Sequence, residues 1–259
     1  MGEYIDINGH PTWVEERGGG GDTIVLLHGG LSNSDLLLDS LGAGLGEQYR
    51  IVAFDRRGHG RTADTDAPLH YTDMATETVG VLETVVGGPA HLVGWSDGGI
   101  IALLMGINHP DLVGRLVAIG ANYHYDGLGP IPLDADSPLM AMIAQGYAER
   151  SPDGGDHFPA VLEKSMTMFS AEPTLTPADL GRITAPTLVL VGDDEAIRID
   201  HTCSLYEALP AGQLAIVPGA THAVPLEKPA EVTHLILDFL GGPEPPQTFM
   251  PVRRQPTMA

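Results

Sequence analysis

Short apolar runs that alternate with helical segments are the feature that most constrains the fold of this chain. Each run is rich in aliphatic or β-branched residues, as a buried strand is. In chain order the runs are TIVLLH, YRIVAF, AHLVGW, GRLVAIG, PTLVLVG and QLAIVPG. Polar loops and helical segments separate most of them, which predicts an α/β fold with a mostly parallel sheet and helices on both faces. The core then comprises residues 1–120 and 181–241.

The start of the chain is an exception to this alternation. Residues 4–16, YIDINGHPTWVEE, contain two short strand-like runs joined at Asn8-Gly9. This dipeptide is a strong short-range signal of a β-hairpin. We therefore expect an antiparallel hairpin before the parallel sheet begins.

A second departure lies in residues 121–180, where Pro, Gly and Met are frequent. Helices are expected near 138–149 and 158–169. We interpret residues 121–180 as a lid inserted over the active edge of the sheet. The Pro-rich tail, residues 242–259, is expected to be disordered.

The segment GWSDGG places Ser96 where the strand AHLVG turns into the helix IIALLMGINHP. In so sharp a turn, a side chain at Gly94 or Gly98 would collide with neighbouring backbone, and the serine is held in a strained conformation with its hydroxyl exposed. Serine is also a favoured N-cap, with Asp97 in the first helical turn. A cap explains one residue but not the glycines, so we expect Ser96 to be a nucleophile.

A serine nucleophile needs a base that takes its proton and an acid that orients the base. In open parallel sheets such groups gather beyond the carboxyl ends of the strands. Among the eleven histidines, His222 follows the last strand on a Gly-containing loop. We expect His222 to be the base, and loop capping is the alternative. His59 and His124 lie in loops at the same edge and are candidates to line a pocket.

The acid is expected just after TLVLVG, where the chain offers Asp193, Asp194 and Glu195. Composition does not choose among them, and all three also suit an acidic surface loop. Whichever serves, the order along the chain is Ser, acid, His, which is the order associated with one particular fold.

The segment LLHGGL offers donors for an oxyanion. Gly29 and Gly30 follow a strand and let backbone N–H groups approach a bound carbonyl. We expect the Gly30 and Asp97 N–H groups to form an oxyanion hole. The alternative is that the glycines only make a turn. His28 is expected to be structural.

Five segments together resemble the successive motifs of the α/β-hydrolase superfamily: HGGLSNSD, FDRRGHGRT, GWSDGG, GDDEAIRIDH and PGATHAVPLEKP. The resemblance covers residues 4–240. The wording VGWSDGGIIALL, followed by IGANYHY, is similar to biphenyl-hydrolase-like serine hydrolases, the group that includes valacyclovir hydrolase, and to small bacterial esterases. The resemblance implies that the acid is Glu195, which stands where aspartate is commoner, with Asp194 as the alternative. Related dehalogenases and epoxide hydrolases use an aspartate nucleophile, so Ser96 implies acyl chemistry.

The expected activity is hydrolysis of small-molecule esters or lactones through Ser96, His222 and Glu195. Carbon-carbon bond hydrolysis and cofactor-free perhydrolysis use the same triad, and a non-catalytic ligand receptor on the same fold is a further alternative. Substrate contacts are expected from Gly29, Leu31, Trp95, His124, Met142 and Met166. The methionines of residues 121–180 are expected either to form an adaptable apolar wall or to pack within the lid: Met140, Met142, Met166 and Met168. The Asp97 carboxylate is expected either to bind a cationic amino group or, more often in such positions, to bond nearby backbone.

Charge and composition exclude several classes of partner. With 34 acidic and 13 basic residues the formal net charge is −21, which opposes binding to nucleic acid or anionic membranes. No apolar run is long enough to span a bilayer, and the one cysteine, Cys203, rules out an internal disulfide, so we expect a cytoplasmic protein. Neither a nucleotide-binding glycine motif nor zinc-ligand spacing is present, so we expect no cofactor and no metal. The expected partner is a small-molecule substrate, and the sequence does not fix the oligomeric state.

Overall fold

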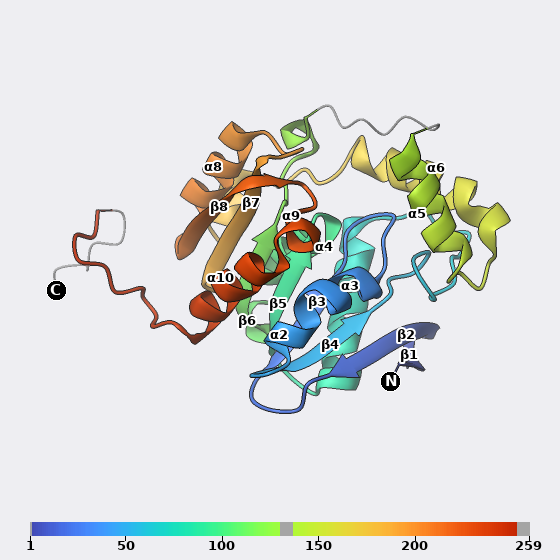
Figure 1. Ribbon diagram of the computed structural model, residues 1–259, viewed down its shortest axis with the longest axis horizontal. Coiled ribbons are helices and arrows are strands. Elements are labelled where there is room, and N and C mark those ends of the chain that lie inside the picture. The colour runs from blue at the N-terminus through green and yellow to red at the C-terminus, as the bar shows by residue number, and fades with distance from the viewer. Residues whose placement is uncertain (1, 130–136, 253–259) are drawn as a thin grey trace.

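A mostly parallel sheet forms the centre of the structure (Figure 1). The computed structural model describes residues 2–129 and 137–252. Their strands are β1 (Glu3–Ile7), β2 (His10–Arg17), β3 (Thr23–Leu27), β4 (Arg50–Phe54), β5 (Ala90–Trp95), β6 (Val113–Ile119), β7 (Thr187–Asp194) and β8 (Gly212–Thr221). They form one eight-stranded sheet in the order β1-β2-β4-β3-β5-β6-β7-β8. The pairs β1–β2 and β2–β4 are antiparallel and all the other pairs are parallel, so the predicted α/β class is confirmed.

The predicted hairpin is the pair β1–β2. Its turn residues, Asn8 and Gly9, have φ values of 56° and 84°, and positive φ at both central residues is what a type I′ turn requires. The Asp6 carboxylate accepts a hydrogen bond from the Gly9 N–H at 2.8 Å. Strand β2 then pairs with β4, so the hairpin extends one edge of the sheet.

Helices cover both faces of the sheet. The longer segments are α3 (Tyr71–Val81), α4 (Asp97–Asn108), α5 (Pro138–Ala148), α6 (Phe158–Phe169), α8 (Ile199–Ala208) and α10 (Pro229–Gly241). The shorter segments are α1 (Ser34–Leu37), η1 (Leu38–Gly42), α2 (Ala43–Leu45), η2 (Leu82–Val86), η3 (Pro110–Leu112), η4 (Tyr125–Gly127), η5 (Gly155–His157), α7 (Pro177–Leu180) and α9 (Val224–Glu227). In the part of the chain that the structure describes, no helix has the length and apolar character needed to cross a membrane.

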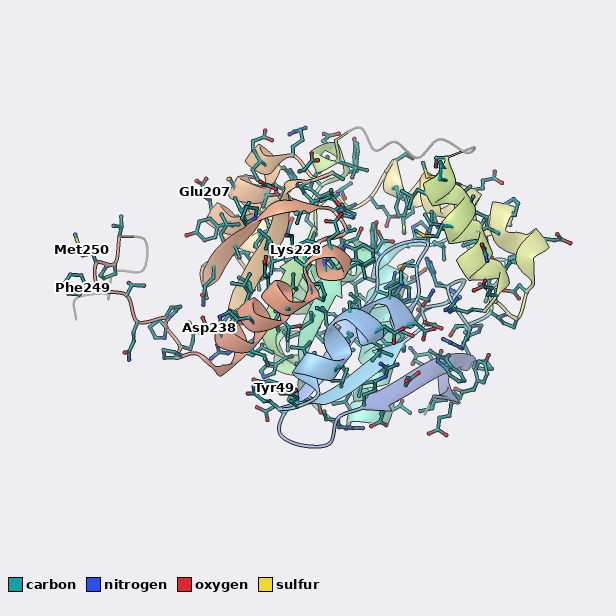
Figure 2. The ribbon with its side chains drawn as sticks, viewed as in Figure 1. Tyr49, Glu207, Lys228, Asp238, Phe249 and Met250 are labelled. Carbon is teal, nitrogen blue, oxygen red and sulfur yellow. The ribbon has the colours of Figure 1, made fainter. Side chains whose placement is uncertain are left out.

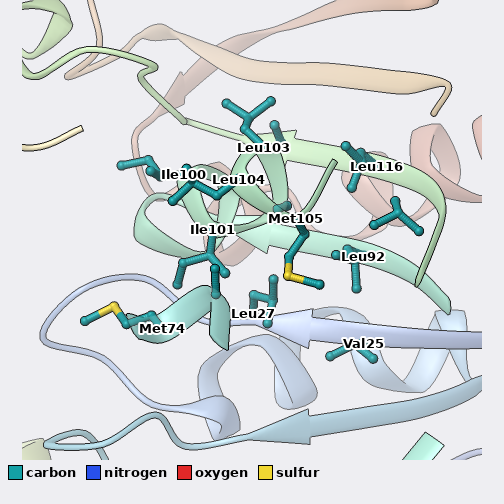
Figure 3. Close-up of a cluster of buried hydrophobic side chains, with 14 of the residues drawn as sticks. Val25, Leu27, Met74, Leu92, Ile100, Ile101, Leu103, Leu104, Met105 and Leu116 are labelled. Atoms are coloured by element: carbon teal, nitrogen blue, oxygen red, sulfur yellow. The ribbon is translucent and has the colours of Figure 1, made fainter. Parts of the chain in front are cut away.

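Successive strand residues point to opposite faces of the sheet and build two hydrophobic clusters. Val25 and Leu27 of β3 belong to the cluster under α3 and α4, part of which is shown in Figure 3. Ile24 and Leu26 belong to the cluster under α1, η1 and α10. The near-continuous apolar runs of the sequence reflect this burial on both sides of the sheet.

Helix α4 is apolar on every side because it is enclosed on every side. All its residues from Asp97 to Ile107 are buried, and Leu103 and Met105 are completely so. A helix that is hydrophobic all round belongs inside a protein, and the buried helix expected after Ser96 is confirmed. Each fully buried large apolar side chain contributes about 1.5–3 kcal/mol, so α4 anchors the turn that precedes it.

Two helical segments change their hydrogen-bonding pattern along their length. Residues 34–45 form α1, the π-helical segment η1 and α2 in succession, and α3 continues into the π-helical segment η2. Leu38 and Leu41 of η1 remain completely buried. An apolar pattern marks which side chains are buried, but it does not encode which carbonyl each N–H selects.

The segment predicted as a lid contains α5 and α6, which confirm the two helices expected there. They pack on each other through Met140, Tyr147, Phe158 and Val161. Leu31, in the loop after β3, packs against this cluster. Arg150, just after α5, lies 2.9 Å from the Asp35 carboxylate, and Lys164 of α6 lies 2.8 Å from that of Asp64. The helical pair is thus fastened to the core by apolar and ionic contacts, and its function as a lid stays a prediction.

The described part of the C-terminal tail extends away from the sheet (Figures 1 and 2). Phe249 is 100% exposed and Met250 is 78% exposed. Residues 253–259 of the predicted tail, like residues 130–136 of the predicted lid, lie outside the described residues. The expected disorder of the tail stays a prediction.

Gly98 tests how closely α4 packs on β3. A Cβ at this position would overlap the Leu27 carbonyl oxygen and lie 2.8 Å from Leu27 Cβ. Because backbone atoms in a central strand cannot yield, we expect Gly98→Ala to lower the free energy of unfolding by about 1–3 kcal/mol, measured by urea denaturation. The control Gly88→Ala adds a Cβ with no atom within 4 Å. Equal stability of the two variants would contradict this account of the packing.

Candidate active site

Ser96 lies in the turn between β5 and α4 with φ 55° and ψ −118°. L residues rarely adopt positive φ, and such a conformation costs of order 1–3 kcal/mol. The Ser96 N–H donates to the Ile119 carbonyl at 2.8 Å, and the Ser96 carbonyl accepts from the Gly99 N–H at 2.8 Å. A Cβ on Gly94 would overlap the Gly98 carbonyl. The steric role expected of Gly94 and Gly98 is therefore confirmed.

Two hydrogen bonds lead from Ser96 to Glu195. Ser96 Oγ lies 3.0 Å from His222 Nε2, and His222 Nδ1 lies 2.5 Å from Glu195 Oε1. An ionised carboxylate only accepts hydrogen bonds, so Nδ1 carries the ring proton and Nε2 is left to accept the serine proton. All three side chains lie beyond the carboxyl ends of parallel strands, where such groups converge. This is the geometry of a serine with an oriented base beside it.

Of the three acidic residues after TLVLVG, Glu195 is the one beside His222. Asp193 Oδ1 accepts a hydrogen bond from the Gly219 N–H at 2.7 Å and so holds the C-terminal part of β8 in place. Asp194 is exposed and ends β7, two residues beyond the predicted end of that strand. The register between β7 and β8 shifts just before Asp194. Glu195, the residue that turns inward, directly follows this irregularity.

Glu195 occupies a tight and polar environment. Its side chain is 2% exposed, and Oε1 also accepts from the Ala196 N–H at 2.7 Å. Gly120, which directly follows β6 and has φ 56°, faces this contact, because a Cβ there would lie 3.0 Å from His222 Nδ1 and 3.3 Å from Glu195 Oε2. Sequence reasoning missed Gly120. Its signal was a glycine that follows a buried strand at the edge where the other candidates meet.

Trp95 holds the backbone of the candidate base. Its indole N–H donates to the His222 carbonyl at 2.7 Å, and the side chain is buried. Gly29 packs against Trp95 and Ser96, because a Cβ at Gly29 would lie 3.2 Å from Trp95 Cε3 and 3.4 Å from Ser96 Cβ. Trp95 and Gly29, both expected to contact substrate, are thus packed around the serine turn.

The two residues expected to donate to an oxyanion, Gly30 and Asp97, are neighbours in space. A Cβ on Gly30 would lie 2.5 Å from Asp97 Oδ2 and 2.7 Å from Phe169 Cζ, so Gly30 has no room for a side chain. Asp97 directly follows Ser96 and begins α4. The Gly30 loop and the start of α4 therefore meet beside the serine, where an oxyanion hole is expected.

The Asp97 carboxylate faces the interior. It is 4% exposed, and Oδ1 accepts a hydrogen bond from the Tyr71 hydroxyl at 2.9 Å. Oδ2 has no hydrogen-bond partner among the described residues. Burial raises the pKa of Asp97, and the Arg56 charge and the Tyr71 hydrogen bond oppose that rise. These contacts support a structural role more than a cation site, and no sequence signal connected Tyr71 with Asp97.

A cavity of about 160 Å³ lies between the loop after β3 and the α5–α6 pair. Leu31 and Met142, both expected to contact substrate, line it. His59 lines it as well, as expected for a pocket residue, and burial lowers the pKa of His59 to about 3. Apolar side chains of the helical pair complete much of the wall: Ile143, Phe158 and Val161.

Two other expected substrate contacts lie elsewhere. His124 precedes η4, where its Nδ1 accepts from the Asp126 N–H at 3.2 Å, and Met166 is 43% exposed on α6. Neither belongs to the cavity lining. Among the described residues, no group of three His, Cys, Asp or Glu side chains is placed to hold a metal ion.

Comparisons with known proteins support a common origin with hydrolases. The alpha/beta hydrolase family matches residues 24–235. A Variovorax paradoxus protein named "putative carbamate hydrolase RutD" is 31% identical, and the match covers 89% of this chain and 96% of that protein. The Homo sapiens serine hydrolase BPHL is 25% identical, with 91% and 85% covered. The crystal structure of CarC, a serine hydrolase involved in carbazole degradation, has a TM-score of 0.78 at 21% identity, covers 93% of this chain and 98% of its own, and shows the likeness of fold.

The buried Asp97 carboxylate predicts a pH-dependent stability difference. Because its pKa is raised in the folded state, the protonated form is favoured by folding, and this contribution is lost as the pH rises through the folded-state pKa. Asparagine has no charge to bury, so we expect Asp97→Asn to gain stability relative to the wild type as the pH rises from about 3.5 to about 7. Urea denaturation across this range measures the difference, with exposed Asp66→Asn as control. A difference that stays constant with pH contradicts the prediction.

Proposed function

This chain belongs to the alpha/beta hydrolase family, which matches residues 24–235, and we propose that it is a serine hydrolase cleaving carboxylic esters or lactones of small molecules. The observation that carries the proposal is the hydrogen-bonded chain from Ser96 through His222 to Glu195. The strained backbone at Ser96 supports it further, because such strain clusters at functional sites.

In the proposed first step, Ser96 Oγ attacks the substrate carbonyl carbon while His222 Nε2 takes the hydroxyl proton. The imidazolium is stabilised by the Glu195 carboxylate, 2.5 Å from Nδ1. Negative charge develops on the carbonyl oxygen, where the Gly30 and Asp97 N–H groups donate. When the tetrahedral intermediate collapses, His222 returns its proton to the leaving alcohol and an acyl-enzyme remains.

The second step reverses the first with water in place of the alcohol. His222 takes a proton from water, and the hydroxide attacks the acyl carbon. The same two N–H groups stabilise the second oxyanion, and Ser96 leaves with the proton held by His222. The product is a carboxylic acid, and the serine and histidine return to their starting states.

Substrate selection is assigned to the α5–α6 pair and the loop after β3. Their side chains, among them Leu31 and Met142, line the 160 Å³ cavity, and Ser96 and His222 are not part of its lining. Its mostly apolar wall suits a small, weakly polar substituent remote from the reacting carbonyl. The net charge of −21 favours neutral or cationic substrates over anions. We further place the reaction in the cytoplasm, as expected from the single cysteine.

The central test is turnover of a panel of nitrophenyl esters and lactones by the wild type and Ser96→Ala. Loss of the nucleophile is expected to lower kcat by about 10⁶-fold where a wild-type rate is found. A burst of alcohol equal to the enzyme concentration is expected when deacylation limits turnover. Ser170→Ala, at an exposed serine after α6, is the control and is expected to keep its activity. Undiminished turnover by Ser96→Ala overturns the proposal.

The identity of the acid is tested by matched amides. Glu195→Gln removes the carboxylate that bonds His222 Nδ1, and we expect kcat to fall by about 10⁴-fold, as loss of such a carboxylate does elsewhere. Asp194→Asn changes an exposed neighbour and is expected to keep kcat within about twofold. The opposite ranking assigns the role to Asp194.

A further inference from the structure

Two buried side chains that the proposed reaction does not use grip the peptide between Gly29 and Gly30. Arg56, just after β4, and His28, just after β3, are both completely buried. Arg56 Nη2 donates to the Gly29 carbonyl at 3.0 Å, and Nη1 donates to the His28 carbonyl at 2.5 Å. The planar guanidinium thus binds two successive carbonyls of the loop after β3 at once.

The hydrogen bonds of His28 fix its tautomer. Its Nε2 lies 3.2 Å from the Arg56 backbone nitrogen, whose N–H can only donate, so Nε2 is the acceptor. Nδ1 therefore carries the proton and donates to the Gly29 carbonyl at 2.7 Å. Burial and the Arg56 charge lower the pKa of His28 well below its usual range, which keeps the ring neutral. The Gly29 carbonyl consequently accepts two hydrogen bonds, one of them from a cation.

A clamp on this carbonyl also sets the direction of the next N–H. The Gly29–Gly30 peptide is not among the cis bonds of the described chain, and in a planar trans peptide the C=O and N–H point in opposite directions. Without the clamp, two successive glycines would leave this peptide free to rotate. The Gly30 N–H has no hydrogen-bond partner among the described residues, so it is available to a ligand.

We propose that Arg56 and His28 are positioning residues that aim and polarise the Gly30 N–H as an oxyanion donor. Hydrogen bonds to a carbonyl strengthen the donor on the same peptide, and a cation behind that peptide favours the developing oxyanion. The inference rests on the proposed function. A buried guanidinium is costly unless an opposite charge compensates it, and the Asp97 carboxylate is the strongest opposing charge around Arg56. The proposed role explains why the chain keeps a guanidinium at this buried position.

The kinetic test compares Arg56→Met and Arg56→Lys with the wild type on an ester substrate. We expect Arg56→Met to lower kcat by about 10²–10³-fold, as loss of one oxyanion donor does, with KM changed by less than about threefold. Affinity for a trifluoromethyl ketone, whose adduct places an oxyanion in the hole, is expected to fall in parallel with kcat/KM. Arg56→Lys keeps the charge without the planar guanidinium, so its kcat and ketone affinity are expected to lie between those of the wild type and Arg56→Met.

The control is Arg57→Met, which alters the next residue, whose guanidinium instead faces Asp73 and Glu77. It is expected to leave kcat and ketone affinity unchanged. If Arg56→Met does not fold, Arg56→Lys carries the test alone. Wild-type kcat and ketone affinity in Arg56→Lys, or a loss confined to KM, overturns the inference.

A crystal structure of the Arg56 variant separates failure of this inference from failure of the proposed function. The clamp predicts that the Gly29–Gly30 peptide changes orientation once the guanidinium is absent, whether or not any ester in the panel is a substrate. A peptide that keeps its orientation in the variant overturns the clamp even if the wild type is active. A reoriented peptide beside an inactive wild type supports the clamp and contradicts the hydrolase mechanism.

Discussion

The close approach of α4 to the sheet at Gly94 and Gly98 is the constraint on which the site depends. Neither position has room for a Cβ, and the chain between them reaches the helix only with Ser96 at positive φ. That conformation costs of order 1–3 kcal/mol. It persists because α4 is buried on all sides, so relaxing the turn would displace a helix from the core. The hydrophobic sequence of α4 is therefore what holds the serine hydroxyl clear of the turn.

The sheet, the helices and the serine turn could be predicted because their signals are local. Apolar runs, Asn8-Gly9 and the glycines around Ser96 each specify backbone geometry within a few residues. The acid could not be chosen from the residues alone. Whether Asp194 or Glu195 turns toward His222 depends on the register shift between β7 and β8, which is set by pairing with a strand that comes later in the chain.

Side-chain directions were the least predictable feature of the site. Trp95 was expected to contact substrate, but its N–H is engaged by the His222 carbonyl. Met142 and Met166 lie on different helices of the predicted lid, and only Met142 lines the cavity. Tyr71, which bonds Asp97, precedes it by many residues and carries no motif. Such contacts depend on how separate elements pack, and no spacing within one element encodes them.

Three of the 13 cations of this acidic chain contact the α5–α6 pair or the loop after β3. Arg150 and Lys164 hold the α5–α6 pair to carboxylates of the core, and Arg56 lies beneath the loop after β3, where it bonds the His28 and Gly29 carbonyls. In a protein of net charge −21, a carbonyl that gains negative charge meets an unfavourable overall field. A buried guanidinium behind the loop opposes that field where water cannot screen it.

Labelling with a fluorophosphonate tests whether His222 activates Ser96. This reagent traps activated serines without requiring the natural substrate, and intact mass with peptide mapping locates the adduct. We predict a single adduct on Ser96 of the wild type that is absent from both Ser96→Ala and His222→Ala. A folded wild type that stays unlabelled, or an adduct that persists in His222→Ala, would contradict this prediction.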